Sequence, residues 1–83
     1  MNREKIINEM IEKWPSSIVA RTEVSRFSGG AINGRTVANL ESKYKNGEYR
    51  GSLPEKLRIG GKVVYRAESL ARWLVNRSTR EDG

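Results

Sequence analysis

The sequence predicts a small, mostly α-helical domain that carries one β-hairpin. Three observations lead to this prediction. The 83-residue chain is long enough for one small core only. Apolar residues recur at helical spacing in several segments, and Gly60-Gly61 separates two short runs of alternating residues. Residues 1–83 are therefore expected to form a single domain, with a frayed polar tail at 78–83.

The first expected element is an amphipathic helix over residues 3–14. Asn2 is suited to cap its beginning, and Pro15 ends it because a proline disfavours the helical conformation in the residue before it. Its apolar residues form one stripe: Ile6, Ile7, Met10, Ile11 and Trp14. This stripe belongs either to the core or to a surface that binds a partner.

A short extended segment and a short helix are expected next. Residues 18–20, Ile-Val-Ala, are typical of a strand. Thr22 is expected to cap a helix over residues 23–28, with Val24 and Phe27 facing inward. Gly29-Gly30 ends this helix, since glycine readily adopts the positive φ of a tight turn.

A longer helix is expected over residues 34–45, capped by Asn33. Its inward side is predicted from the spacing of Val37, Leu40 and Tyr44. The opposite face is polar without being acidic, and consists of Arg35, Asn39 and Ser42, with Lys43 at its edge and Thr36 near the first turn. These residue types hydrogen-bond base edges and phosphates in nucleic acids.

Residues 46–55 are expected to form a loop, followed by a hairpin with strands over 56–59 and 62–66. Alternation within each strand predicts an apolar face that packs on the helices and a largely basic outer face. The predicted apolar face holds Leu57, Ile59, Val63 and Tyr65; the outer face holds Lys56, Arg58, Lys62, Val64 and Arg66. A last helix is expected over 67–77, with Leu70, Trp73 and Leu74 inward. Trp14, Phe27, Trp73 and Tyr65 are expected in the core.

The charge of the chain is concentrated in its middle. The net charge is +6, and residues 33–66 hold eight Lys or Arg against three Glu, so +5 of it lies there. Such a local positive field favours a polyanionic partner. The chain has no Cys and no His, so no thiolate or imidazole is present for nucleophilic, general-base or metal chemistry. No catalytic activity, metal, cofactor, small-molecule substrate or membrane span is expected, and the predicted location is the cytoplasm.

The order of elements, two short helices with an outward polar face on the second and then a basic hairpin, describes a winged helix-turn-helix. From Ile18 to Leu74 the sequence also resembles the excisionase and AlpA-type regulators of the MerR-like winged helix-turn-helix superfamily. Three stretches carry the resemblance: RTEVSRFSGG, INGRTVANLESK and PEKLRIGGKVVYRAESLARWL. The loop 46–55 is longer than is usual in that family, and the N-terminal helix is an addition to it.

The resemblance implies a sequence-specific protein that binds double-stranded DNA, as an excisionase or small transcriptional regulator of a phage, mobile element or bacterial nucleoid. The recognition helix, about 34–45, would enter the major groove. The resemblance assigns base reading to Asn33, Arg35, Thr36, Asn39 and Lys43, and wing contacts to Arg58, Lys62 and Arg66. From the residues themselves we add Ser42, on the same helix face, to the base-reading set. We also expect backbone contacts from Lys45 and Lys56, while Arg21 and Arg26 are as suited to contacting phosphate as to making no contact.

Further expected partners are a second copy of the chain or a recombinase. Two other functions remain open on the sequence. One is a protein-interaction module that uses the apolar stripe of residues 6–14. The other is an accessory of DNA packaging or replication built on the same fold.

Overall fold

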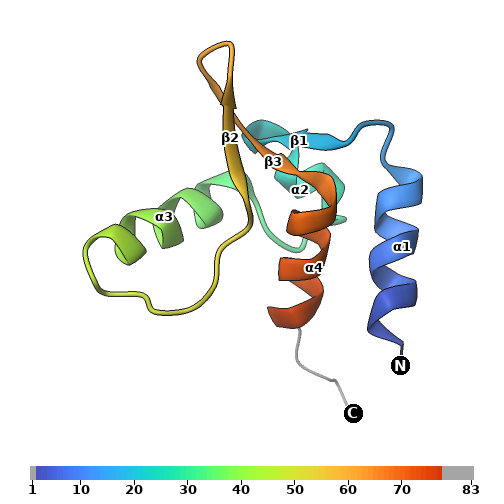
Figure 1. Ribbon diagram of the computed structural model, residues 1–83, viewed down its shortest axis with the longest axis horizontal. Coiled ribbons are helices and arrows are strands. Elements are labelled where there is room, and N and C mark those ends of the chain that lie inside the picture. Colours follow the sequence, from blue (N-terminus) through green and yellow to red (C-terminus); the bar gives the residue numbers. More distant parts are fainter. Residues whose placement is uncertain (1, 78–83) are drawn as a thin grey trace.

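Four α-helices and a three-stranded antiparallel sheet make up residues 2–77, the part of the chain that the computed structural model describes (Figure 1). The elements are α1 (Arg3–Lys13), β1 (Ile18–Ala20), the 3₁₀ turn η1 (Arg21–Glu23), α2 (Val24–Phe27), α3 (Gly34–Lys45), β2 (Lys56–Ile59), β3 (Lys62–Arg66) and α4 (Ala67–Arg77). The predicted order of elements is confirmed. The expected frayed tail, 78–83, lies outside the described residues.

Helices α1 and α4 lie side by side and antiparallel, and form one side of the molecule (Figure 1). The Asn2 side chain accepts a hydrogen bond from the Lys5 backbone N–H and so caps α1, as predicted. The helix ends at Lys13, and Trp14 before Pro15 is extended, at φ −98° and ψ 128°. Across the pair, the Arg72 guanidinium donates to the Glu4 carboxylate at 2.7 Å.

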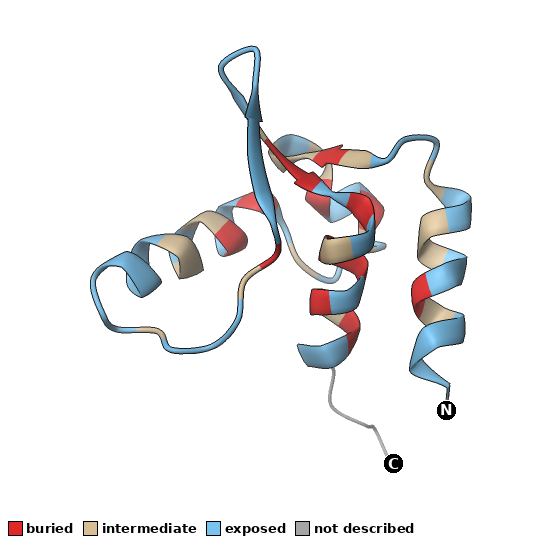
Figure 2. Ribbon diagram, viewed as in Figure 1, coloured by how far each residue is buried: buried red, intermediate tan, exposed pale blue. Residues whose placement is uncertain are grey.

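The sheet has the strand order β1-β3-β2, with both pairings antiparallel. The central strand β3 pairs Tyr65 with Val19 of β1 and with Lys56 of β2. The Gly60-Gly61 turn has positive φ values of 58° and 79°, as a two-residue hairpin turn requires. All of β2, one of the two edge strands, is exposed (Figure 2).

The core lies where the two-helix side meets β1, β3, α2 and the start of α3 (Figure 2). Its fully buried large side chains are Ile7, Val19, Val24, Val37, Tyr65 and Leu70. Phe27 and Trp73 are buried as expected, whereas Trp14 is half-buried and meets the Phe27 ring edge-on, with centroids 5.3 Å apart. Figure 1 shows α3 and the hairpin projecting from this body in different directions.

The prediction that Thr22 caps the first short helix is wrong. The chain leaves β1 directly into η1, so Thr22 lies inside that turn, not before a helix. Helix α2 begins only at Val24, and its N-cap residue, Glu23, makes no capping hydrogen bond through its side chain. Val24 and Phe27 nevertheless face the core as expected.

The prediction that Tyr44 faces inward is also wrong, because Tyr44 is 56% exposed. Val37 is buried and Leu40 half-buried, so the inward face of α3 holds for its first two turns. Beyond them the helix extends past the body of the protein (Figure 2), and its residues from Ser42 to Lys45 are exposed.

The predicted division of the hairpin into an apolar face and a basic face is wrong as well, because Lys56 and Arg58 lie on the face of Val63 and Tyr65, and Lys62 and Arg66 lie on the other face. The register pairs Leu57 with Val64 and Ile59 with Lys62, so Leu57 and Ile59 lie on the face opposite Tyr65. Residues that pair across an antiparallel ladder share a face, and a two-residue turn pairs odd with even positions. Leu57 and Ile59 are therefore exposed, while Val64, expected outside, is buried.

Candidate nucleic-acid interface

Helix α3 begins in close contact with η1. Asn33 caps it, and its Oδ1 accepts from the Thr36 backbone N–H at 2.9 Å and from the Thr36 hydroxyl at 3.1 Å. Gly34 is buried, and a methyl group built on its Cα would overlap the Arg21 carbonyl oxygen. Glycine is thus required here for close approach. The contact fixes the point from which α3 leaves the body.

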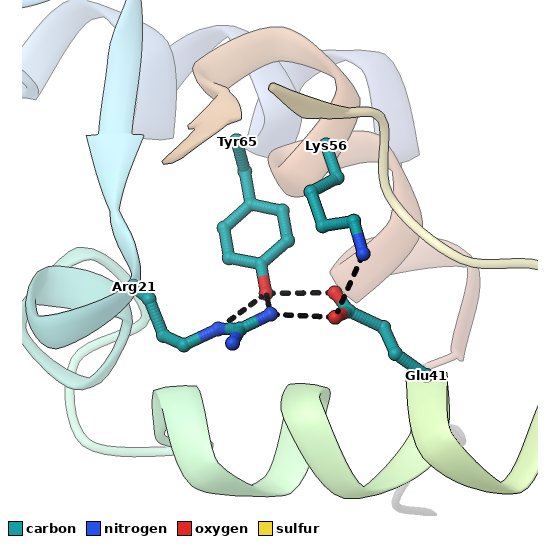
Figure 3. Close-up of polar contacts among 4 residues, drawn as sticks. All are labelled: Arg21, Glu41, Lys56 and Tyr65. Carbon is teal, nitrogen blue, oxygen red and sulfur yellow. Dashed lines mark hydrogen bonds and ion pairs between the residues drawn. The ribbon is translucent and has the colours of Figure 1, made fainter. Parts of the chain in front are cut away.

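A network of four polar side chains ties α3 to the base of the hairpin (Figure 3). The Arg21 guanidinium donates to Glu41 at 2.5 Å and to the Tyr65 hydroxyl at 3.0 Å. The Tyr65 hydroxyl donates to the other Glu41 oxygen at 2.8 Å, and the Lys56 ammonium lies 3.5 Å from Glu41. Because these residues come from η1, α3, β2 and β3, the network holds the helix against the sheet.

The network also shifts the pKa values of two of its members. Burial raises the pKa of Tyr65 to about 12, against the smaller opposing effect of the hydrogen bond from Arg21. Burial opposes the charged form of Arg21, but its hydrogen bond to Tyr65 and the charge of Glu41 outweigh that effect and raise its pKa. Arg21 therefore remains a cation and Tyr65 a neutral donor at physiological pH.

The predicted base-reading face of α3 is exposed and turned away from the body. At about 100° per residue, Arg35, Asn39 and Ser42 lie roughly 140–160° around the helix from buried Val37. All three are exposed, as is Lys43 beside them. Arg35 and Asn39 are one turn apart, so their side chains can reach neighbouring points of one ligand.

Asn33 and Thr36, the other two predicted base-reading residues, are exposed but already bonded to each other at the N-cap. The cap uses the Asn33 carbonyl oxygen and the Thr36 hydroxyl proton. The Asn33 amide NH₂ and the Thr36 hydroxyl oxygen remain able to bond a ligand. The two groups are held at the start of the reading face.

The cations predicted to contact the DNA backbone divide into two groups. Four are engaged with a carboxylate of the chain: Arg21 and Lys56 with Glu41, Arg66 with Glu55 at 3.4 Å, and Arg26 with Glu23 at 4.0 Å. The others, Lys45, Arg58 and Lys62, form no ion pair within residues 2–77. Arg58 donates instead to the Gly61 carbonyl oxygen at 3.3 Å, inside its own hairpin.

Taken together, the unpaired cations of residues 33–66 lie on α3, on the hairpin and on the loop between them. Within the described chain, the exposed cations of this segment without an ion-pair partner are Arg35, Lys43, Lys45, Arg50, Arg58 and Lys62. On the opposite side, α1 carries as many Glu as Lys and Arg, and Arg72 of α4 pairs with Glu4 and Glu68. The segment made of α3, the loop and the hairpin therefore carries an excess of positive charge, whereas the charges on α1 cancel.

Sequence reasoning missed two residues of this surface. Arg50 was counted in the charge of the central segment but not assigned to the site, because no periodicity applies to a loop. Tyr44 was assigned to the core by its spacing, and its exposed phenol lies on the same helix as Lys43. The loop itself is attached to the body by the Trp73 indole N–H, which donates to the Ser52 carbonyl at 2.8 Å.

No protein-family model, curated protein or solved structure matches this chain. Within residues 2–77, no group of three or more His, Cys, Asp or Glu side chains could hold a metal ion. No helix in the same range is long and apolar enough to cross a membrane.

Proposed function

We propose that the protein binds double-stranded DNA as a winged helix-turn-helix, with α3 as the recognition helix and the β2–β3 hairpin as the wing. One observation carries the proposal. Six exposed cations of residues 33–66 have no ion-pair partner within residues 2–77, and they lie on α3, the hairpin and the loop between them, whereas α1 carries three Lys or Arg balanced by three Glu. A duplex is a dense line of phosphates, and its affinity for a protein depends mainly on such unpaired Lys and Arg.

The dimensions of α3 suit the major groove. A twelve-residue helix is about 18 Å long, and a groove about 12 Å wide accepts one α-helix. Arg35 can bond guanine through two N–H groups, and Asn39 can bond adenine in the same bidentate manner. Lys43 and Lys45, nearer the exposed end, are placed for phosphates.

The hairpin contributes contacts to the DNA backbone or minor groove. Arg58 and Lys62 lie near the glycine turn, on opposite faces of the hairpin, and both are exposed. Lys56 and Arg66 lie at its base and share their charge with Glu41 and Glu55, so their contribution to affinity is smaller. Arg21 is engaged in the network of Figure 3, so we expect a smaller contribution from it to DNA binding.

The biological role that fits this proposal is that of an excisionase, which directs recombination, or of a small transcriptional regulator in the bacterial cytoplasm. It follows the resemblance of residues 18–74 to such proteins, and it requires no cofactor. A packaging or replication accessory would use the same contacts with DNA and differ in its protein partner.

The salt dependence of DNA binding tests the proposal. The logarithm of the affinity falls with that of the salt concentration, by about 0.9 for each phosphate neutralised. The double variant Lys43→Ala/Lys45→Ala should therefore reduce the slope by nearly 2. The control Arg3→Ala/Lys5→Ala removes two exposed cations from α1 and should leave it unchanged. No binding, or equal effects of both variants, would overturn the proposal.

A further inference from the structure

An apolar groove of about 530 Å³ opens between α1 and α2, and no residue of α4 lines it. Ile6, Met10 and Trp14 line one side, each one turn from the next, and all three are half-buried. Phe27 lines the groove opposite them and meets Trp14 edge-on. Ile7 belongs to the same apolar stripe but is buried and does not line the groove, whereas Ile6, Met10 and Trp14 stay half-buried, so the fold leaves part of this stripe exposed in the groove.

Charged side chains of both signs surround this groove. Glu9 and Lys13 lie along α1, one turn apart and exposed, and neither forms an ion pair with any described residue. Glu23 and Arg26 lie on the other side, 4.0 Å apart. The four charges cancel, on a chain whose net charge is +6. A polyanion is therefore not attracted here, and a second positively charged copy is not repelled.

We propose that this groove is the contact between two copies of the chain, related by a two-fold axis that sets their α1 helices antiparallel. In that arrangement Glu9 of each copy lies opposite Lys13 of the other, and both ion pairs form at once. A parallel arrangement would set Glu9 against Glu9. The apolar side chains of the two grooves, Met10 above all, cover one another between these pairs.

The contact between the two copies is small, so it should be weak. An eleven-residue helix is about 16 Å long, which limits the buried area to less than the roughly 1,200 Å² of a stable dimer. Self-association is therefore expected at high protein concentration. Helix α1 and α3 lie on opposite sides of the molecule (Figure 1), so two copies joined through α1 keep both α3 helices accessible. The proposal does not depend on DNA binding.

Sedimentation equilibrium of the full chain, with charge-reversed variants, tests the contact. Glu9→Lys alone and Lys13→Glu alone should each weaken self-association about tenfold, because each of the two symmetric ion pairs contributes a few-fold. Glu12→Lys is the matched control: it makes the same charge change on an exposed α1 site outside the groove, and should have no such effect. Unfolding curves check that each variant is folded.

The decisive sample is an equimolar mixture of the two single variants. One copy then carries Lys at both positions and the other carries Glu at both. Antiparallel helices restore both ion pairs between unlike copies, so the mixture should associate about as well as the wild type and better than either variant alone. A monomeric wild type at about millimolar concentration, single variants that associate like the wild type, or a mixture no better than its components would each overturn the proposal.

Discussion

Glu41→Gln tests whether the network of Figure 3 stabilises the attachment of α3 to the sheet. The substitution keeps the size of the side chain and an acceptor oxygen but removes the charge that Arg21 and Lys56 share. The Glu41 side chain is only 14% exposed and that of Arg21 31%. A charge-assisted hydrogen bond in such surroundings contributes about 1.5–3 kcal/mol, so we expect the free energy of unfolding to fall by about 2 kcal/mol.

For a domain of this length, each 1 kcal/mol corresponds to about 4–8 °C in melting temperature. Glu41→Gln should therefore lower it by about 8–16 °C. Urea unfolding followed by the fluorescence of Trp14 and Trp73 gives the free energy directly. Glu55→Gln is the control, since its pair with Arg66 is about half exposed on both sides and should contribute less than about 0.5 kcal/mol. Equal losses in the two variants would refute the reasoning.

Three further predictions follow from the same contacts. The pKa of Tyr65 is raised from 10.0 to about 12, so its contribution to stability is fully present below pH 10 and is lost as the pH rises towards 12. The free energy of unfolding should therefore fall less steeply with pH across that window in Tyr65→Phe than in the wild type. Parallel curves for the two proteins would argue against this prediction. Gly34→Ala should destabilise the protein by about 1–3 kcal/mol despite the helix preference of alanine, because the new methyl group meets the Arg21 backbone; a rise in melting temperature would show that the contact is not close. Asn33→Ala should cost about 1 kcal/mol through loss of the α3 cap, whereas Asn33→Asp keeps the capping oxygen and should keep the stability; similar unfolding curves for Ala and Asp would contradict this.

Local signals in the sequence were sufficient for most element boundaries, though not for η1 and α2, where Thr22 lies inside the 3₁₀ turn. Asn2 and Asn33 cap their helices, Pro15 follows the end of α1, and Gly60-Gly61 makes the hairpin turn, all as predicted. Each of these depends on the conformation of a few neighbouring residues. Most helix and strand limits could be predicted for the same reason.

What could not be predicted depends on how the elements meet. The spacing of Tyr44 marks a face of α3, but only the tertiary arrangement determines that the body ends before that residue. The pairing across the hairpin determines on which face of the sheet Leu57 and Ile59 lie. Alternation within each strand, taken separately, does not include this pairing. Counting residues through the two-residue turn would have corrected the predicted faces.

The sequence also could not predict which cations form ion pairs within the protein and which remain unpaired on its surface. Arg21 contacts Glu41, 20 positions away, and Tyr65, 44 positions away. Nothing local distinguishes it from Arg35, which has no ion-pair partner among the described residues. The charge of the central segment was visible in the sequence, but the set of unpaired side chains that could contact DNA was not.

Selection from a pool of random-sequence duplexes, at about 50 and 200 mM salt, is the most direct test of the proposed DNA binding. The account predicts that a short motif is enriched by the wild type and persists at the higher salt. It also predicts that Arg35→Ala and Asn39→Ala each lose the preference at particular positions of that motif. Enrichment of no motif, or of an unchanged motif by both variants, would contradict the claim that α3 reads DNA sequence.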